Sequence, residues 1–202
     1  ITLILVLVGF LRPVSGATDA DNSIFGDSSP LKINITTDIN ALWSNRVDPE
    51  YQSALISITG ESWQIGGKTE VKIAGKSRRA LCELPPLRVK LKNMNQPWEN
   101  KISKLKIVLG CSANEVSNDE VIKEYLSYKL YNTIAPESYA VRLAEITILD
   151  LEGNIAEYTM GFILEPDSHL EQRVSIEEIK KKNLNTAQLI NAFYRERNET
   201  SS

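Results

Sequence analysis

Basic side chains gather in two short segments that could bind phosphate. The segment 75–79 reads GKSRR. Gly75 permits close approach of a ligand to the backbone, Ser77 offers a hydroxyl, and Arg79 and the arginine before it supply fork-shaped donors for phosphate oxygens. In the alternating segment 87–92, LRVKLK, three cations project from one face and three apolar side chains from the other. These residue types are typical both of a phosphate-binding cleft and of a solvated basic surface, so both interpretations stay open.

The other reactive side chains exclude most familiar enzyme classes. One histidine and two cysteines cannot form a tetrahedral zinc site on their own, and they leave each catalytic-triad scheme a single candidate base. The histidine, His169, has no second soft ligand beside it in the sequence, so we expect it at the protein surface. The 23 basic and 26 acidic side chains give a net charge of -3, which argues against a general nucleic-acid partner.

The first residues resemble a secretion signal. Residues 1–11 are apolar apart from Thr2 and Gly9, and small residues follow at 15–17, as around a signal-peptide cleavage site. A run of about 11 apolar residues is too short to cross a bilayer as a helix, so we expect no transmembrane helix here. There is no initiating methionine, so we expect the sequence to begin inside a longer reading frame. We expect export to the periplasm, the cell envelope or the medium, with a buried N-terminal strand or helix as the alternative.

The patterning of the chain predicts one α+β domain with further helices after residue 174. At 202 residues, 42% of them hydrophobic, the chain is long enough for one core. The segment 117–132 predicts a helix with a capping box formed by Ser117 and Glu120. Short runs rich in Val, Ile and Leu predict an antiparallel sheet. The expected strands are 31–36, 53–60, 62–65, 69–75, 87–92, 104–110, 138–150 and 157–165.

The two cysteines are placed to form a disulfide. Disulfides persist in the oxidising compartments that export implies. The two strands on either side of the polar loop 93–103 can pair as a hairpin. A register with Leu87 opposite Lys106 would bring Cys82 and Cys111 together at the open end of this hairpin. The alternative is two free, buried thiols.

Six segments together resemble one known family. In chain order they read IAGKSRR, CELPPLRVKLKN, KLKIVLGC, IKEYLSYKLYN, SYAVRLAEITILD and YTMGFILE, and the similarity runs from about Leu31 to Arg173. They resemble the secreted CotH-type (spore coat protein H) atypical kinases, and most closely the exported relatives of unassigned function in that family. The resemblance implies a two-lobed kinase-like fold that binds ATP in its cleft. These segments would form its small lobe, an antiparallel sheet with a single packed helix.

The resemblance also assigns roles to individual residues. It implies that the turn 75–79 covers phosphates, with Ala74 where the family often has arginine. By the family's pattern, Lys90 is the lysine that reaches the phosphates, and Glu124, on the helix, is its ion-pair partner. Glu165 would fall where such folds connect their lobes, and would contact the adenine. The alternatives are an exposed helix carboxylate at Glu124 and an ordinary strand end at Glu165.

The same resemblance divides the chain and limits its activity. With the signal-peptide remnant at 1–17 that the apolar run indicates, it implies a β-rich small-lobe domain at 18–173 and the start of a larger lobe at 174–202. ATP and magnesium are implied for the whole kinase. The catalytic carboxylate and the metal ligands of this fold lie in the larger lobe, so we expect this chain to be catalytically incomplete. A nucleotide is the expected ligand and the missing lobe the expected partner; the alternative is a non-catalytic envelope or surface module.

Overall fold

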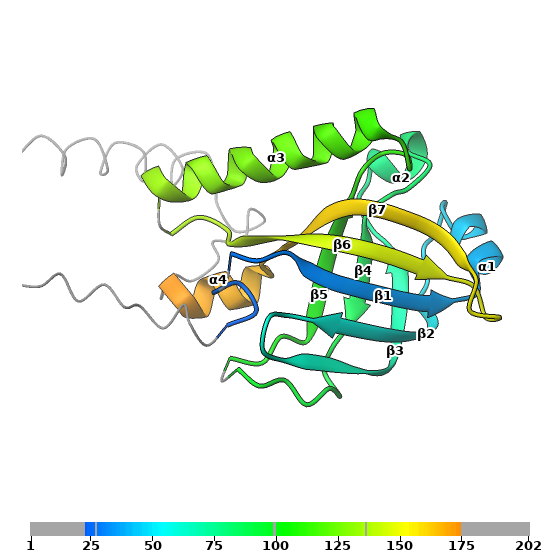
Figure 1. Cartoon of the computed structure of the whole chain (residues 1–202), viewed down its shortest axis with the longest axis horizontal. Coiled ribbons are helices and arrows are strands. Elements are labelled where there is room, and N and C mark those ends of the chain that lie inside the picture. The colour runs from blue at the N-terminus through cyan, green and yellow to red at the C-terminus, as the bar shows by residue number, and fades with distance from the viewer. Residues whose placement is uncertain (1–22, 27, 99, 136, 175–202) are drawn as a thin grey trace, which may run out of the picture.

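A computed structural model describes residues 23–26, 28–98, 100–135 and 137–174, which form a β-barrel with helices on its outside (Figure 1). The strands are β1 (Leu31–Thr37), β2 (Gln52–Thr59), β3 (Gln64–Ile73), β4 (Leu87–Lys90), β5 (Lys104–Leu109), β6 (Val141–Leu149) and β7 (Ile155–Leu164). The helices are α1 (Ile39–Ser44), α2 (Arg78–Leu81), α3 (Glu115–Ile134) and α4 (Asp167–Val174). The expected signal peptide at 1–17 and the expected helices beyond residue 174 lie outside the described residues.

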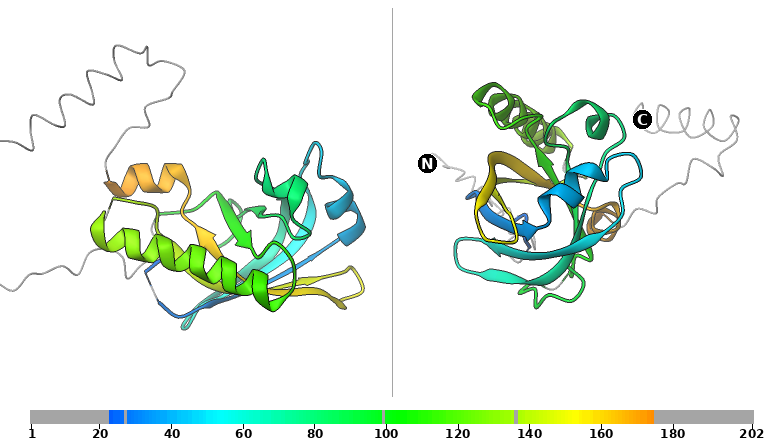
Figure 2. Two further views of the ribbon diagram at one scale, coloured as in Figure 1. Left: turned by 90° about the horizontal axis from the view of Figure 1, so that it is seen from above. Right: turned by 90° about the vertical axis from the view of Figure 1, so that its right-hand side faces the viewer.

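The seven strands form one closed sheet in the order β1-β2-β3-β4-β5-β7-β6. The neighbouring pairs are antiparallel except β1 with β6, which run parallel and close the barrel; Figure 2 shows the ring of strands from one end. The predicted α+β class is confirmed, but the sheet closes into a barrel through a parallel pair, so the expected antiparallel sheet of a kinase-like small lobe is wrong. The reason lies in β1, which pairs with β2 on one side and with β6 on the other and so joins the two edges of the sheet.

The barrel interior is the hydrophobic core. Alternate residues of the strands point inward, for example Leu31, Ile33 and Ile35 of β1, whose side chains are fully buried. Trp98 packs into the same core from the loop between β4 and β5, with its ring edge-on to that of Trp63 at 5.1 Å between centroids. This alternation leaves most polar residues of the strands on the outer surface of the barrel; the buried exceptions are Thr37, Arg142 and Thr159.

The β4–β5 hairpin forms one residue out of the predicted register. Leu87 lies opposite Ile107 rather than Lys106. Because a shift of one residue turns all the side chains of a strand to the opposite face, only the observed register puts the apolar residues of both strands inside the barrel. The two prolines before β4 keep Cys82 out of the ladder, so the cysteines do not mark the register of the strands.

Helix α3 begins earlier than its sequence pattern predicts. Its first residue is Glu115, because the side chain of Asn114 caps the helix by accepting a hydrogen bond from the Ser117 amide at 2.8 Å. The hydroxyl of Ser117 is buried and instead meets the hydroxyl of Ser112 at 3.0 Å. The predicted helix is therefore present, but Asn114 rather than Ser117 is its cap.

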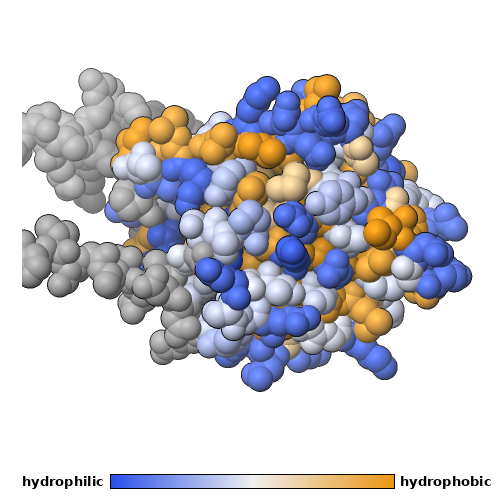
Figure 3. All heavy atoms as spheres, viewed as in Figure 1, coloured by the Kyte–Doolittle hydropathy of each residue, from blue (hydrophilic) through white to orange (hydrophobic). Residues whose placement is uncertain are grey.

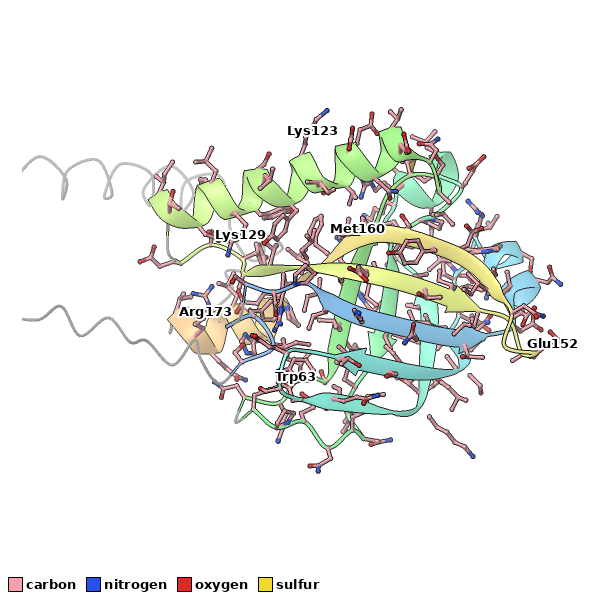
Figure 4. The ribbon with its side chains drawn as sticks, viewed as in Figure 1. Trp63, Lys123, Lys129, Glu152, Met160 and Arg173 are labelled. Atoms are coloured by element: carbon pink, nitrogen blue, oxygen red, sulfur yellow. A yellow bond between two sulfur atoms is a disulfide. The ribbon has the colours of Figure 1, made fainter. Side chains whose placement is uncertain are left out.

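One face of α3 fixes the helix against β5, β6 and β7. The packed cluster consists of Val108, Val121, Val141 and Phe162, bordered by Tyr125, Tyr128, Met160 and Leu164. Figure 4 shows Met160 beneath the helix and Lys123 pointing away from the barrel. The helix also carries exposed large hydrophobic side chains, Leu126, Leu130, Tyr131 and Ile134. Figure 3 shows hydrophobic surface along the C-terminal half of the helix. The packing of the inner face against the strands fixes the rotation of α3 about its own axis. It therefore determines which polar residues of the helix face β5.

The predicted disulfide is confirmed. Cys82 and Cys111 are bonded, with their Cα atoms 4.6 Å apart. Cys82 follows the short helix α2, and Cys111 lies in the loop from β5 to α3, so the bond ties the basic turn to the strand and helix beside it. The bond is consistent with an oxidising, extracellular environment. Within the described ranges, no helix has the length and apolar character needed to cross a membrane.

Removing the disulfide should lower the stability of the chain. The bond closes a loop with a sequence separation of 29 and so restricts the unfolded chain. The Cys82→Ser/Cys111→Ser variant should lose about 3 to 4 kcal/mol of unfolding free energy. Urea unfolding followed by tryptophan fluorescence measures the loss, with the wild-type chain under reducing conditions as the matched control. An oxidised wild type no more stable than the variant would show that the bond does not constrain the fold.

Candidate functional site

A small cavity of about 180 Å³ opens between the basic turn, β5 and α3. Its polar lining comes from all three: Gly75, Lys76, Ser77 and Arg78 from the turn and the start of α2, Lys106 from β5, and Glu124 and Tyr128 from α3. The chain brings them together because the turn joins β3 to β4, while β5 leads directly into α3. Several cations thus face one carboxylate across a confined space.

Backbone geometry and one ion pair shape the turn. Gly75 has a φ of 81°, a left-handed conformation that favours glycine. The amide of Ala74 donates to the carbonyl of Pro86 at 2.7 Å and so closes the base of the turn. Arg78 then pairs with Glu124 at 3.0 Å between nitrogen and oxygen. Because these side chains are 34% and 39% exposed, the pair contributes at most about 1 kcal/mol, and its main effect is to hold the turn beside α3.

Lys106 lies at the centre of the site. It lines the small cavity and also a larger cavity beside it. Its pKa is lowered because burial disfavours its charge and Arg88 repels it, an effect that Glu124 partly offsets. An anion bound next to Lys106 would favour the charged form of the lysine and would itself be attracted.

The larger cavity, of about 660 Å³, lies against the end of β7. Its volume falls within the range of roughly 300 to 1,000 Å³ that is typical of small-molecule sites. The sheet contributes the cations Arg88, Lys104 and Lys106, and Leu164 lies directly opposite Lys106 in the β5–β7 ladder. The start of α4 contributes the carboxylates of Asp167 and Glu171. The cavity therefore holds cations from the sheet beside carboxylates from α4, next to the small cavity.

Glu165, just after β7, is held by its neighbours. Its side chain is fully buried and accepts hydrogen bonds from His169 at 2.6 Å, from Arg173 at 2.9 and 3.0 Å and from the Ala140 amide at 2.8 Å. Burial alone would raise its pKa, but the hydrogen bonds outweigh burial and lower the pKa to about 2. The carboxylate thus joins α4 to the barrel, and it could contact a ligand only by giving up these bonds.

His169 is buried, so the expectation that it lies at the surface is wrong. Its side chain is 8% exposed, and its ring centroid lies 5.9 Å from that of Phe25. The reason is its spacing, since His169 and Arg173 lie four residues apart on one face of α4 and both turn toward Glu165. Charged hydrogen bonds, which residue types alone do not reveal, hold this helix in place.

The predicted ion pair between Lys90 and Glu124 is also wrong. Lys90 binds Glu70 at 2.6 Å and lies 4.4 Å from the centroid of the Tyr51 ring. In the strand order, β5 separates β4 from β7 and β6, and α3 packs on β5, β7 and β6. The lysine that shares a cavity with Glu124 is therefore Lys106 of β5.

The structure places the other predicted site residues at three positions: the small cavity, a neighbouring groove and the larger cavity. Gly75 and Ser77 line the small cavity together with Glu124, as the sequence analysis expects of a site. Arg79 faces a groove on the other side of the turn. Glu165 lines the larger cavity, although its carboxylate is already bonded.

The sequence pattern does not single out Lys106, although it alternates with buried apolar residues in the segment that runs directly into the helix. Arg78 is expected in the basic turn as a donor for phosphate oxygens, but its pairing with Glu124 is not predicted. Which of the two adjacent arginines faces α3 depends on how the short helix α2 is oriented.

Among the described residues, no group of three His, Cys, Asp or Glu side chains is placed to hold a metal ion. Comparison of the chain with models of known families, with curated proteins and with solved structures finds no match. The chemistry of the site therefore follows from its geometry alone.

Replacing Glu165 with glutamine should remove a pH-dependent part of the stability. The folded chain lowers the pKa of Glu165 from an ordinary 4.5 to about 2. The carboxylate therefore stabilises the fold above about pH 4.5, and this stabilisation is lost as the pH falls toward 2. Glu165→Gln should be about 3 kcal/mol less stable near neutral pH, and its difference from the wild type should shrink on acidification.

Urea unfolding at a series of pH values measures this difference. Glu152→Gln is the matched control, because Glu152 lies exposed in the turn between β6 and β7 (Figure 4) and its carboxylate should matter little. A Glu165→Gln profile parallel to that of the wild type throughout the acidic range would contradict the role given to these hydrogen bonds.

Proposed function

We propose that this chain is the nucleotide-binding part of an exported atypical phosphotransferase, of the CotH-type kinases that its sequence resembles. The observation that carries the proposal is the small cavity where the glycine-containing turn, Lys106 and Glu124 meet. A kinase small lobe needs a turn that covers phosphates, a strand lysine that reaches them and a helix carboxylate that positions the basic groups. In this proposal Lys106 takes the role that the sequence pattern gives to Lys90.

Electrostatics favour a phosphate group in the small cavity. Lys76, Arg78 and Lys106 line it, against the single carboxylate of Glu124. Burial and neighbouring arginines disfavour the charge on Lys106, and a bound oxyanion would offset both effects. The guanidinium of Arg78, already held by Glu124, can offer further nitrogens to phosphate oxygens.

The larger cavity suits the rest of a nucleotide. It adjoins the small cavity at Lys106 and Tyr128, which line both. We assign the base and ribose to this space, beside Leu164 and Pro166, with the phosphates directed toward the turn. Burial raises the pKa of the Tyr128 phenol, so this group stays a neutral hydrogen-bond donor at the junction.

Nucleotide binding does not require the expected kinase-like sheet, because both cavities lie on the outer face of the barrel. Phosphoryl transfer requires more, namely a catalytic carboxylate and residues that hold magnesium. In the described part of the chain, no group of three His, Cys, Asp or Glu side chains could hold a metal ion, and the family pattern places the catalytic groups in the larger lobe. We therefore propose that this chain binds ATP without transferring its phosphate, and that magnesium, where the whole protein uses it, is held by other residues.

ATP should raise the melting temperature of the 202-residue chain, and Lys106→Ala should abolish most of the shift. A charge-assisted hydrogen bond contributes about 1.5 to 3 kcal/mol, so its loss should weaken ATP binding roughly 10- to 100-fold. Isothermal titration calorimetry measures the affinity directly.

Lys90→Ala is the matched control. It removes the same charge from the neighbouring strand, at a lysine paired with Glu70, and should leave the ATP affinity within about twofold of the wild type. Equal losses in the two variants would point to general charge attraction and argue against the site. A wild-type chain that gives neither a heat of binding nor a thermal shift would overturn the proposal and favour the alternative, a non-catalytic envelope module.

A further inference from the structure

A row of three cations crosses the outer face of the barrel beside the candidate nucleotide site. Lys72 of β3 lies opposite Arg88 of β4, and Arg88 lies opposite Lys106 of β5. Their chain neighbours Val71 and Val89 are fully buried in the barrel, so the three cations share the outer face. Like charges directly opposite one another destabilise a sheet, so this row favours a bound anion.

Nearby carboxylates do not neutralise the row. Glu70 is bound to Lys90 at 2.6 Å, and Glu124 is bound to the turn at 3.0 Å. No carboxylate in the part of the chain that the structure describes lies within salt-bridge distance of Lys72 or Arg88.

The ammonium of Lys72 donates to the Pro49 carbonyl at 3.5 Å and lies 4.8 Å from the centroid of the Tyr51 ring, while Arg88 is exposed. Neither cation has a carboxylate among the described residues to neutralise it, so both would still attract an anionic ligand.

The row forms the floor of a groove of about 470 Å³. Its charged lining consists of Lys72, Lys76, Arg79, Arg88 and Lys106, with Asp48 as the acidic member. The turn stands between this groove and the small cavity, so that Arg78 lines the cavity and Arg79 lines the groove. The two adjacent arginines therefore line two different hollows, one on each side of the turn.

We infer that this groove is a second anion site, which binds a phosphate-bearing ligand distinct from the nucleotide. Its several cations exceed what one carboxylate ligand would balance, so a multiply charged anion fits the groove best. Arginine and lysine together supply the fork-shaped donors and point charges that phosphate oxygens favour.

The place of the groove suggests the role of its ligand. Lys106, Gly75 and Lys76 line both the groove and the small cavity, so a ligand in the groove would lie next to the phosphates of a bound nucleotide. That is where a second substrate belongs, a role that rests on the proposed function. Binding of the anion itself does not depend on it.

Inorganic tripolyphosphate is the probe that tests the groove. Calorimetric titration of the whole chain at low salt should detect binding, and Lys72→Ala/Arg79→Ala should weaken it by about tenfold or more. The same variant should change the ATP affinity by no more than about twofold, because neither side chain lines the small cavity. Both residues are partly exposed, and an unchanged melting temperature confirms that the variant is folded.

Lys32→Ala/Lys123→Ala is the matched control, since it removes the same total charge from exposed positions on β1 and on the outer side of α3 (Figure 4). It should leave tripolyphosphate binding unchanged. Equal weakening by the two double variants would mean attraction by overall charge and would overturn the inference. Displacement of tripolyphosphate by ATP, with no effect of the groove variant, would also overturn it, because the probe would then occupy the nucleotide site.

Two further results separate the inference from the proposed function and identify the source of the phosphate. Tripolyphosphate binding that needs Lys72 and Arg79, in a chain that does not bind ATP, would support the groove and remove the nucleotide proposal. A phosphoserine peptide, compared with its unphosphorylated form, tests a protein-borne phosphate. Tighter binding of the phosphopeptide supports the groove as a site for a phosphorylated chain, and tighter binding of tripolyphosphate supports it as a site for free polyphosphate.

Discussion

The parallel pairing of β1 with β6 is the constraint on which the rest of the structure depends. It joins the first strand of the barrel to one of the last and so commits one face of each strand to a shared apolar interior. Most charged residues of these strands are left on the outside, but Arg142 of β6 is buried, with its guanidinium donating to the carbonyls of Ser29 and Ile24. Helix α3 and the disulfide-tied turn can then pack only on that outer surface, and the small cavity forms where they meet beside β5. The alternation of apolar and polar residues along the strands therefore determines both the core and the surface on which the candidate site forms.

Local sequence patterns predicted most of the helices and strands of this fold, but not the closure of the sheet into a barrel. Alternation and capping signals locate strands and a helix because these depend on near neighbours in the chain. Closure of the sheet depends on strands that are far apart in the sequence, and the register of each strand depends on which of its faces the closed barrel buries. The β4–β5 hairpin illustrates this, because the cysteines suggest one register while burial of Leu87 opposite Ile107 decides another. The start of α3 is a smaller case, in which Asn114 competes successfully with Ser117 for the cap.

For the candidate site, residue types identified the turn and the helix but the wrong strand. Lys90 and Lys106 occupy similar alternating segments, and both project outward from the barrel. Strand order, which no local pattern reveals, places Lys106 in the cavity with Glu124. Glu165 shows a related limit of sequence reasoning. A buried carboxylate needs compensating hydrogen-bond donors. The donors of Glu165 lie on α4, and only the structure shows that this helix packs at the end of β7.

The anchoring of α4 also bears on the larger cavity. Arg173, one residue before the end of this helix, binds both the buried carboxylate and the carbonyl of Ser138, the latter at 2.7 Å. These bonds hold the last turn of α4 against the barrel, while the start of the same helix lines the larger cavity. Breaking the bonds of this one carboxylate would therefore release the helix and that part of the cavity lining together.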